Sequence, residues 1–117
     1  MSQSNSFADD VERFISQVMV ELADVSYRGA IACQNHMKRH APWTNRTGHA
    51  RQRLTATSAL NLEEKAFIIT LAHGVDYGVY LELAHEKRFA IILPTIRVLA
   101  PQITQEFRGV IDRVRGE

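Results

Sequence analysis

Residues 41–54, A-P-W-T-N-R-T-G-H-A-R-Q-R-L, divide this chain into two parts. Pro42 disfavours helical backbone at Ala41, so a helix that arrives from the N-terminal side is expected to end there. The stretch carries the single Trp of the chain together with three Arg residues and His49, and it holds no acidic residue. We expect one long helix before it and a compact body of strands and helices after it.

The part before this stretch is predicted to be one amphipathic helix over residues 1–40. Ser6 can cap its start. No proline intervenes before Pro42, so the helix would be roughly 50 Å long. A helix of that length must pack along the whole body or project to a neighbour, and Gly29 is the expected bend. Its apolar stripe consists of Phe7, Val11, Phe14, Ile15, Val18, Leu22 and Val25.

The part after the stretch is predicted to begin with a β-hairpin. Residues 54–60 and 66–72 are rich in β-formers and are joined by a polar turn. The second strand is the more apolar and should be the better buried. Asp76 can then cap a short helix over residues 77–84.

The C-terminal part is predicted to be a helix. Pro94 suits its first position, and Pro101 should kink or split it. Residues 89–93 suit either a third strand or a buried lead-in to this helix. The expected fold is a single α+β domain with a long helix (1–40), a basic loop and turn (41–53), a hairpin plus short helix (54–93) and a C-terminal helix (94–117).

The composition is that of one folded domain. The chain has 117 residues, 45% of them hydrophobic, and no apolar run is long enough to span a bilayer. The N-terminus lacks the features of a signal peptide, and the one cysteine, Cys33, cannot form an internal disulfide, so synthesis in a reducing cytoplasm is expected.

Charge alternates along the chain in blocks. Residues 1–35 and 63–86 are acidic, whereas residues 36–62 and 87–117 are basic. This pattern suits a subunit that meets copies of itself or other partners through complementary patches. Ordinary solvated faces would give the same pattern.

Two groups of residues invite a chemical interpretation, and neither is complete. Cys33, His36 and His40 would project from one helical face, as zinc ligands do, but no fourth ligand lies nearby in the sequence. The second group, with residue types suited to acid–base catalysis, lacks a nucleophile motif and a phosphate-binding glycine loop. It consists of His73, Asp76, Glu82 and His85. We therefore predict no catalytic, cofactor-binding or metal-binding residues.

Residues 36–53 are rich in Lys, Arg and His and contain no acid. The alternative function is therefore a small basic nucleic-acid-binding module. However, the segment lacks the interleaved aromatic residues of single-strand binders and has no major-groove recognition motif. A further hypothesis makes Glu82 a buried partner of Arg51 or Arg53.

An ordered set of short motifs resembles a family of small neck proteins of bacteriophages with long non-contractile tails. Members of this family are called tail-completion, minor tail or head–tail joining proteins. Ala50 stands where the family usually has Leu, and the Gly-Thr that often follows the Glu is absent. The motifs, in chain order, are Ala41-Pro42, Thr47-Gly48-x-Ala50-Arg51, Asp76-Tyr77-Gly78-x-Tyr80-Leu81-Glu82, and Pro94 before a closing helix.

The resemblance implies a structural virion protein without catalysis or cofactor. Copies would form a homo-oligomeric ring in the neck, between the head-completion connector on the capsid portal and the tail terminator or tail tube. DNA would pass through the lumen without specific binding, and no membrane would be involved. The protein would assemble in the host cytoplasm and remain in the virion.

The residues expected at the interfaces of this ring are Trp43, Arg46, Arg51, Arg53, Tyr77, Tyr80 and Glu82. Trp43 suits an anchor, because buried Trp and Arg dominate interface energetics; alternatively it covers the hairpin. The basic residues, with Lys38 and Arg39, would face DNA or the acidic block of an adjacent subunit. The subunit contact is favoured, since a DNA conduit should not grip phosphates tightly. Trp43→Ala and charge reversal at Arg51 should then impair assembly more than folding.

Overall fold

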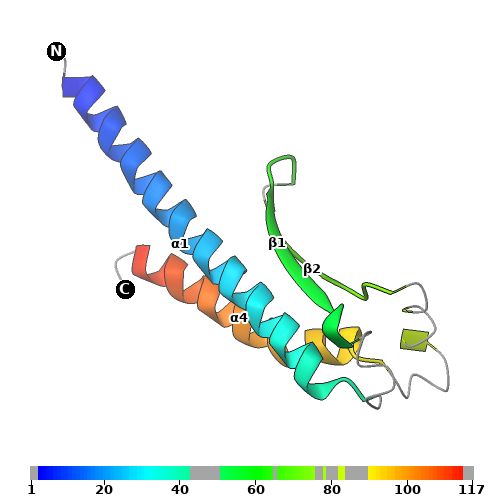
Figure 1. The fold of residues 1–117 in the computed structure, drawn as a ribbon. Coiled ribbons are helices and arrows are strands. Elements are labelled where there is room, and N and C mark those ends of the chain that lie inside the picture. Colours follow the sequence, from blue (N-terminus) through cyan, green and yellow to red (C-terminus); the bar gives the residue numbers. More distant parts are fainter. Residues whose placement is uncertain are drawn as a thin grey trace.

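The structure is a computed structural model that describes residues 3–42, 51–64, 66–75, 78, 82–83 and 90–114. Its elements follow in the order α1 (Gln3–His40), β1 (Thr55–Asn61), β2 (Ala66–Ala72) and α4 (Ile92–Val114). Figure 1 shows α4 lying along one half of α1, while the other half of α1 extends past the end of α4. Helices and an antiparallel hairpin together confirm the predicted α+β fold.

α1 is one continuous helix of 38 residues. At about 1.5 Å per residue its length is about 57 Å, which accounts for most of the 67 Å long dimension of the molecule. It ends at His40, as the position of Pro42 predicted. It begins at Gln3, so the prediction that Ser6 caps it is wrong. Ser and Asn cost well under about 1 kcal/mol inside a helix, so the residues before Ser6 continue the helix.

The two strands form an antiparallel pair whose register runs from Thr55 opposite Ala72 to Asn61 opposite Ala66. The turn is stabilised by the side-chain oxygen of Asn61, which accepts a hydrogen bond of 3.0 Å from the backbone N–H of Glu64. β2 has more partly buried positions than β1, as predicted. Leu54 was expected to open the first strand, but it precedes β1 and is fully buried in the core.

Gly29 lies where α1, α4 and β2 meet. A Cβ atom built on Gly29 would lie 3.0 Å from Cδ1 of Ile103 on α4 and 3.2 Å from Cδ1 of Ile69 on β2. The glycine therefore permits close approach of the three elements, and α1 continues through it without interruption. A second point of attachment is the hydrogen bond of 3.0 Å from the N–H of Ala56 to the side-chain oxygen of Gln34.

Of the segment 89–93, the structure describes residues 90–93: Ala90 and Ile91 lead into α4 without forming a strand, and Ile92 and Leu93 already belong to it. Ile91 is buried in a cluster with Met37, Ala41 and Leu54. α4 begins at Ile92, so Pro94 lies in the first turn and is not the first helical residue. Proline is tolerated there because the first N–H groups of a helix have no partner within it.

α4 then runs through Pro101 to Val114, so the expected split of the helix does not occur. Packing of α4 on α1 over this length offsets the one backbone hydrogen bond that Pro101 cannot donate. Within the predicted short helix 77–84, the residues that the structure describes, Gly78, Glu82 and Leu83, have helical backbone.

Candidate functional site

The carboxylate of Glu82 lies among four hydrogen-bond partners within the described residues. Oε1 accepts hydrogen bonds from the backbone N–H of Ile91 at 2.9 Å and of Ile92 at 3.1 Å, and Oε2 accepts one from Leu93 at 3.3 Å. Nε2 of His73 lies 3.1 Å from Oε1. We call this arrangement the Glu82 cap, because it occupies N–H groups at the start of α4 that have no acceptor within the helix.

The local sequence explains why a distant residue caps α4. The positions just before the helix are Phe89, Ala90 and Ile91, and none of these side chains can accept a hydrogen bond. A carboxylate at this place also interacts favourably with the positive end of the helix dipole. Glu82 therefore links the end of β2, through His73, to the start of α4.

The environment of Glu82 favours its ionised form. Burial alone would raise the pKa of Glu82, but the hydrogen bonds from Ile91, Ile92, His73 and Leu93 outweigh burial and bring the pKa below its ordinary value. An ionised carboxylate can only accept hydrogen bonds, so Nε2 of His73 carries the hydrogen in this contact. Both oxygens of Glu82 thus have partners within the chain, which is the chemistry of a structural cap.

Two glycines make room for the groups around this cap. A Cβ on Gly78 would lie 2.4 Å from Cβ of His73, and a Cβ on Gly74 would lie 2.6 Å from the backbone oxygen of Arg53. No side chain fits at such distances. Gly78 in the Tyr-Gly-x-Tyr motif therefore has a steric role beneath His73.

Arg51 holds the other end of the long helix. Its Nη1 donates to the carbonyl oxygen of Lys38 at 2.7 Å, and its Nη2 donates to that of Ala41 at 2.9 Å. These carbonyl groups belong to the last turn of α1 and the residue after it, where no further helical N–H is available. A cation at this position also complements the negative end of the helix dipole. Arg51 is half-buried and fixes the exit of the chain from α1.

The hypothesis that Glu82 pairs with Arg51 or Arg53 is wrong. The described partners of Glu82 are His73 and the backbone of α4, whereas Arg51 binds the end of α1. Arg53 is exposed, and its Nη1 lies 3.4 Å from the carbonyl oxygen of Gly74. Opposite charges suggested an Arg–Glu pair. Instead, Glu82 accepts hydrogen bonds from backbone N–H groups at the start of α4, and Arg51 donates to backbone carbonyl groups at the end of α1.

Of the seven residues expected at interfaces, four lie outside the described residues: Trp43, Arg46, Tyr77 and Tyr80. Asp76 and His85 lie outside them as well. The interface roles of Arg51, Arg53 and Glu82 stay predictions. The structure assigns Arg51 and Glu82 roles in folding that the sequence did not suggest.

Cys33, His36 and His40 are brought close by α1, but they do not converge as ligands. The rings of His36 and His40 stack with centroids 4.1 Å apart, and Nδ1 of His40 lies 3.0 Å from the carbonyl oxygen of His36. Burial, followed by the nearby His40 and Arg39 charges, lowers the pKa of His36, and burial raises the pKa of the Cys33 thiol. Within the described ranges, no group of three His, Cys, Asp or Glu side chains is placed to hold a metal.

The N-terminal end of α1 is an exposed surface of a different kind. Residues 6–18, here called the arm, carry the first part of the predicted apolar stripe, and Phe7 is 71%, Phe14 48% and Ile15 54% exposed. The last turn of α4 lies beside Glu21, where Nη2 of Arg113 is 3.9 Å from its carboxylate. The arm therefore extends beyond the end of α4. The sequence indicated this exposed segment through an apolar stripe on α1 that is longer than the rest of the chain can cover.

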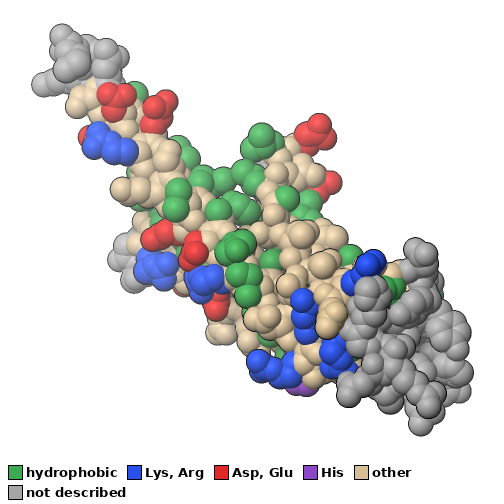
Figure 2. All heavy atoms as spheres, in the orientation of Figure 1, with side chains coloured by type: hydrophobic (Ala, Val, Ile, Leu, Met, Phe, Trp, Pro, Cys, Tyr) green, Lys and Arg blue, Asp and Glu red, His purple; other side chains and the backbone are tan. Residues whose placement is uncertain are grey.

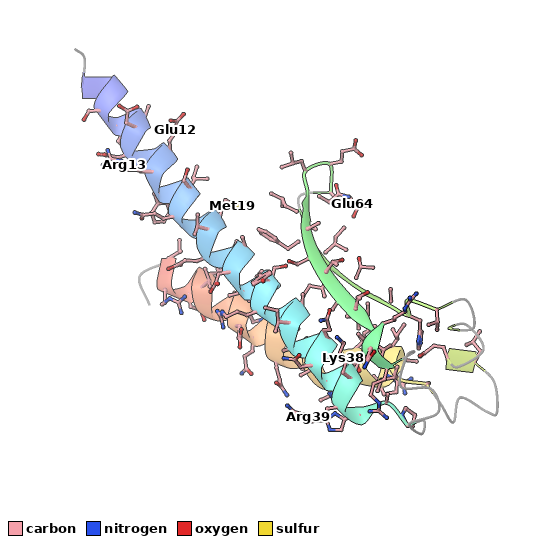
Figure 3. All side chains as sticks on the ribbon, viewed as in Figure 1. Glu12, Arg13, Met19, Lys38, Arg39 and Glu64 are labelled. Carbon is pink, nitrogen blue, oxygen red and sulfur yellow. The ribbon has the colours of Figure 1, made fainter. Side chains whose placement is uncertain are left out.

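Charge is distributed unevenly between the two ends of α1. Figure 2 shows acidic side chains with a smaller number of basic ones on the arm, and basic side chains gathered at the opposite end. Figure 3 labels Glu12 and Arg13 on the arm, and Lys38 and Arg39 near the end of α1. Between the two ends the charges are mixed, because Arg28 lies near Glu106 and Arg113 near Glu21 where α4 packs along α1.

Comparisons of this chain with protein-family models, curated proteins and solved structures found no match. Neither described helix has an apolar stretch long enough to cross a membrane.

Proposed function

We propose that this chain is an assembly subunit, a ring-forming tail-completion or head–tail joining component of a phage neck. Its partners are further copies of itself, the connector on the capsid and the tail terminator or tail tube. The observation that carries the proposal is the arm, a helical segment whose apolar stripe is left uncovered by its own chain. A monomer gains nothing from exposing Phe7, Phe14 and Ile15 along one helix face, whereas a subunit can bury them against a neighbour.

The order of the elements also supports this proposal. The chain runs from a long helix through a hairpin to a closing helix, which is the order that the resemblance to the neck family implies. Of the motifs, Ala41-Pro42 directly follows α1 and Pro94 lies in the first turn of α4, whereas most residues of the other two motifs lie outside the described residues. The polar groups of Glu82 and Arg51 are bonded to backbone at two helix ends, which suits a rigid body that presents adhesive surfaces.

Deletion of the gene from the phage that encodes this chain tests the proposal. We expect lysates with DNA-filled heads and separate tails, and purified protein added to such a lysate should restore joined, infectious particles. Labelled protein should be located where head and tail meet. Infectious particles of normal form that lack the protein would overturn the proposal.

The rival function is nucleic-acid binding, and one observation favours it. Lys38 and Arg39 lie near the end of α1 (Figure 3), and Arg51, only two positions before Arg53, binds the carbonyl groups of that same end. A DNA-binding module would retain duplex DNA at moderate salt, with an affinity that falls steeply as salt rises. The neck subunit should show no such retention as a free protein. Duplex binding measured between about 50 and 200 mM salt separates the two functions.

A further inference from the structure

A groove with apolar walls runs between β2 and α4. It is lined by Cys33 of α1, Ile69 of β2, and Ile96, Ala100, Ile103 and Phe107 of α4. Ile96 and Ala100 are exposed, so the α4 side of the groove is open to solvent. The rings of Phe67 and Phe107, with centroids 6.1 Å apart, lie at one end of it. We call this surface the α4 groove.

The arm matches the α4 groove in length and in character. On the arm the apolar positions extend from Phe7 to Val18, and on α4 the lining positions extend from Ile96 to Phe107. Both intervals contain the same number of helical residues and are about 16 Å long. An apolar helix face and an apolar groove of equal length can bury one another along their whole extent.

The charges around the two surfaces are opposite in sign. Arg97 and Arg108 lie on α4 next to the lining residues Ile96 and Phe107, and they have no ion-pair partner in the part of the chain that the structure describes. On the arm, Glu12 lies at the edge of the apolar stripe and is likewise without an ion-pair partner among the described residues. Complementary unpaired charges steer surfaces together and fix their orientation.

The arm cannot reach the groove of its own chain. It belongs to the same continuous helix whose later residues, Val25 and Gly29, are buried in the body. The α4 groove lies beside that body, and a straight helix cannot fold back on itself. If an arm occupies this groove, it is therefore the arm of a second copy.

We propose that the arm of one copy docks in the α4 groove of the next, so that each copy gives one arm and receives another. The proposal rests on the proposed function, that copies of this chain assemble with one another, and it names the surfaces they use. Because the two surfaces differ, the contact is heterologous, and repeated contacts of this kind close into a ring or extend as a filament.

A mixing experiment with two full-length variants tests this arrangement. Phe14→Glu places a charge on the apolar face of the arm and leaves the groove intact. Ala100→Glu places an acid in the groove and leaves the arm intact. Both residues are exposed, so both variants should fold, which circular dichroism and thermal unfolding will verify.

The expected result is specific to a heterologous contact. Light scattering on a sizing column should show association of the unaltered chain, monomers for each variant alone, and a heterodimer that grows no further when the variants are mixed. Ser16→Glu on the arm and Gln105→Glu on α4 are matched controls, exposed and outside both surfaces, and they should associate like the unaltered chain.

Charge reversal gives a second measurement that does not depend on the apolar contact. Arg97→Glu with Arg108→Glu should weaken association, and Glu12→Lys on a second copy should recover part of it. Arg39→Glu, exposed near the other end of α1, is the control and should have no effect.

Each other outcome overturns the proposal. One such outcome is that Phe14→Glu prevents association, whereas the groove variants Ala100→Glu and Arg97→Glu with Arg108→Glu still associate. Arms would then pair with arms or occupy another surface. An unaltered chain that stays monomeric up to its solubility limit would also overturn it. The neck function is tested separately, by particle assembly. If normal particles form without the protein, the neck function is wrong whatever the mixing experiment shows. If the protein restores joining but the variants form no heterodimer, the neck function stands and only the arm–groove contact is wrong.

Discussion

At the scale of single residues, Glu82 supplies the cap that the residues before α4 lack. Its three backbone hydrogen bonds are to a charged acceptor, so Glu82→Gln should lower the free energy of unfolding by about 1.5–3 kcal/mol at pH 7. Chemical denaturation measures this change. Glu63→Gln in the exposed turn removes the same charge without such partners and should leave stability unchanged.

The pKa of Glu82 gives this stabilisation a pH dependence. Because the pKa is lower in the folded chain than in the unfolded one, the contribution is fully present above the unfolded pKa of about 4.3 and is lost as the pH falls through the folded pKa. The stability difference between the unaltered chain and Glu82→Gln should therefore shrink as the pH is lowered below about 4.3. A difference that grows on acidification would contradict the assignment of Glu82 as an ionised cap.

Arg51 and Arg53 are only two positions apart, but their side chains contribute differently to the structure. Arg51→Ala removes two hydrogen bonds, at 2.7 and 2.9 Å, from half-buried carbonyl groups and should lower the free energy of unfolding by about 1.5–3 kcal/mol. Arg53→Ala removes one exposed contact at 3.4 Å and should change it by less than about 0.5 kcal/mol. Thermal and denaturant unfolding compare them. Equal effects would show that Arg51 does not hold the end of α1, and charge reversal at Arg51 is now expected to impair folding itself.

At the scale of elements, substitutions at two helical glycines separate the effect of close helix packing from that of helix propensity. A Cβ on Gly109 would have only Nη1 of Arg113 nearby, at 3.9 Å, so Gly109→Ala should raise the free energy of unfolding by up to about 1 kcal/mol. Gly29→Val would force Ile103 and Ile69 apart and should lower it by about 1–3 kcal/mol. Unfolding curves of both variants test whether Gly29 sets the spacing of α1, α4 and β2. A neutral Gly29→Val would mean that this contact yields easily.

The elements themselves could be predicted because their signals are local. The three-and-four spacing from Phe7 to Val25 and Pro42 at its end determine α1, and β-forming runs on either side of a polar turn determine the hairpin. The Glu82 cap could not be predicted, since its acceptor lies about ten residues before the donors and depends on the path between them. The sequence shows that the stripe on α1 is long, but only the position of α4 shows which part remains uncovered.

At the scale of the whole molecule, an uncovered arm has consequences for local stability. The half of α1 that packs on α4 and the hairpin is held by tertiary contacts, whereas the arm depends on helix propensity alone. Isolated helices shorter than about 12–15 residues are marginal in water. Amide hydrogens of the arm should therefore exchange much faster than those of residues 25–37 when the chain is a dilute monomer.

Assembly should change this exchange pattern in a way that depends on which surface is altered. In the unaltered chain, raising the concentration should protect the arm, because each arm then lies in the groove of another copy. In Ala100→Glu the arm has its native sequence, but no copy offers a working groove, so it should stay unprotected at every concentration. Mixing with Phe14→Glu should protect the arm of the Ala100→Glu copies and not that of the Phe14→Glu copies, which mass spectrometry can distinguish because the two arms differ in mass. Protection of both arms in the mixture would mean that the arms bury themselves against each other, and the whole molecule would then be a symmetric dimer instead of a link in a ring.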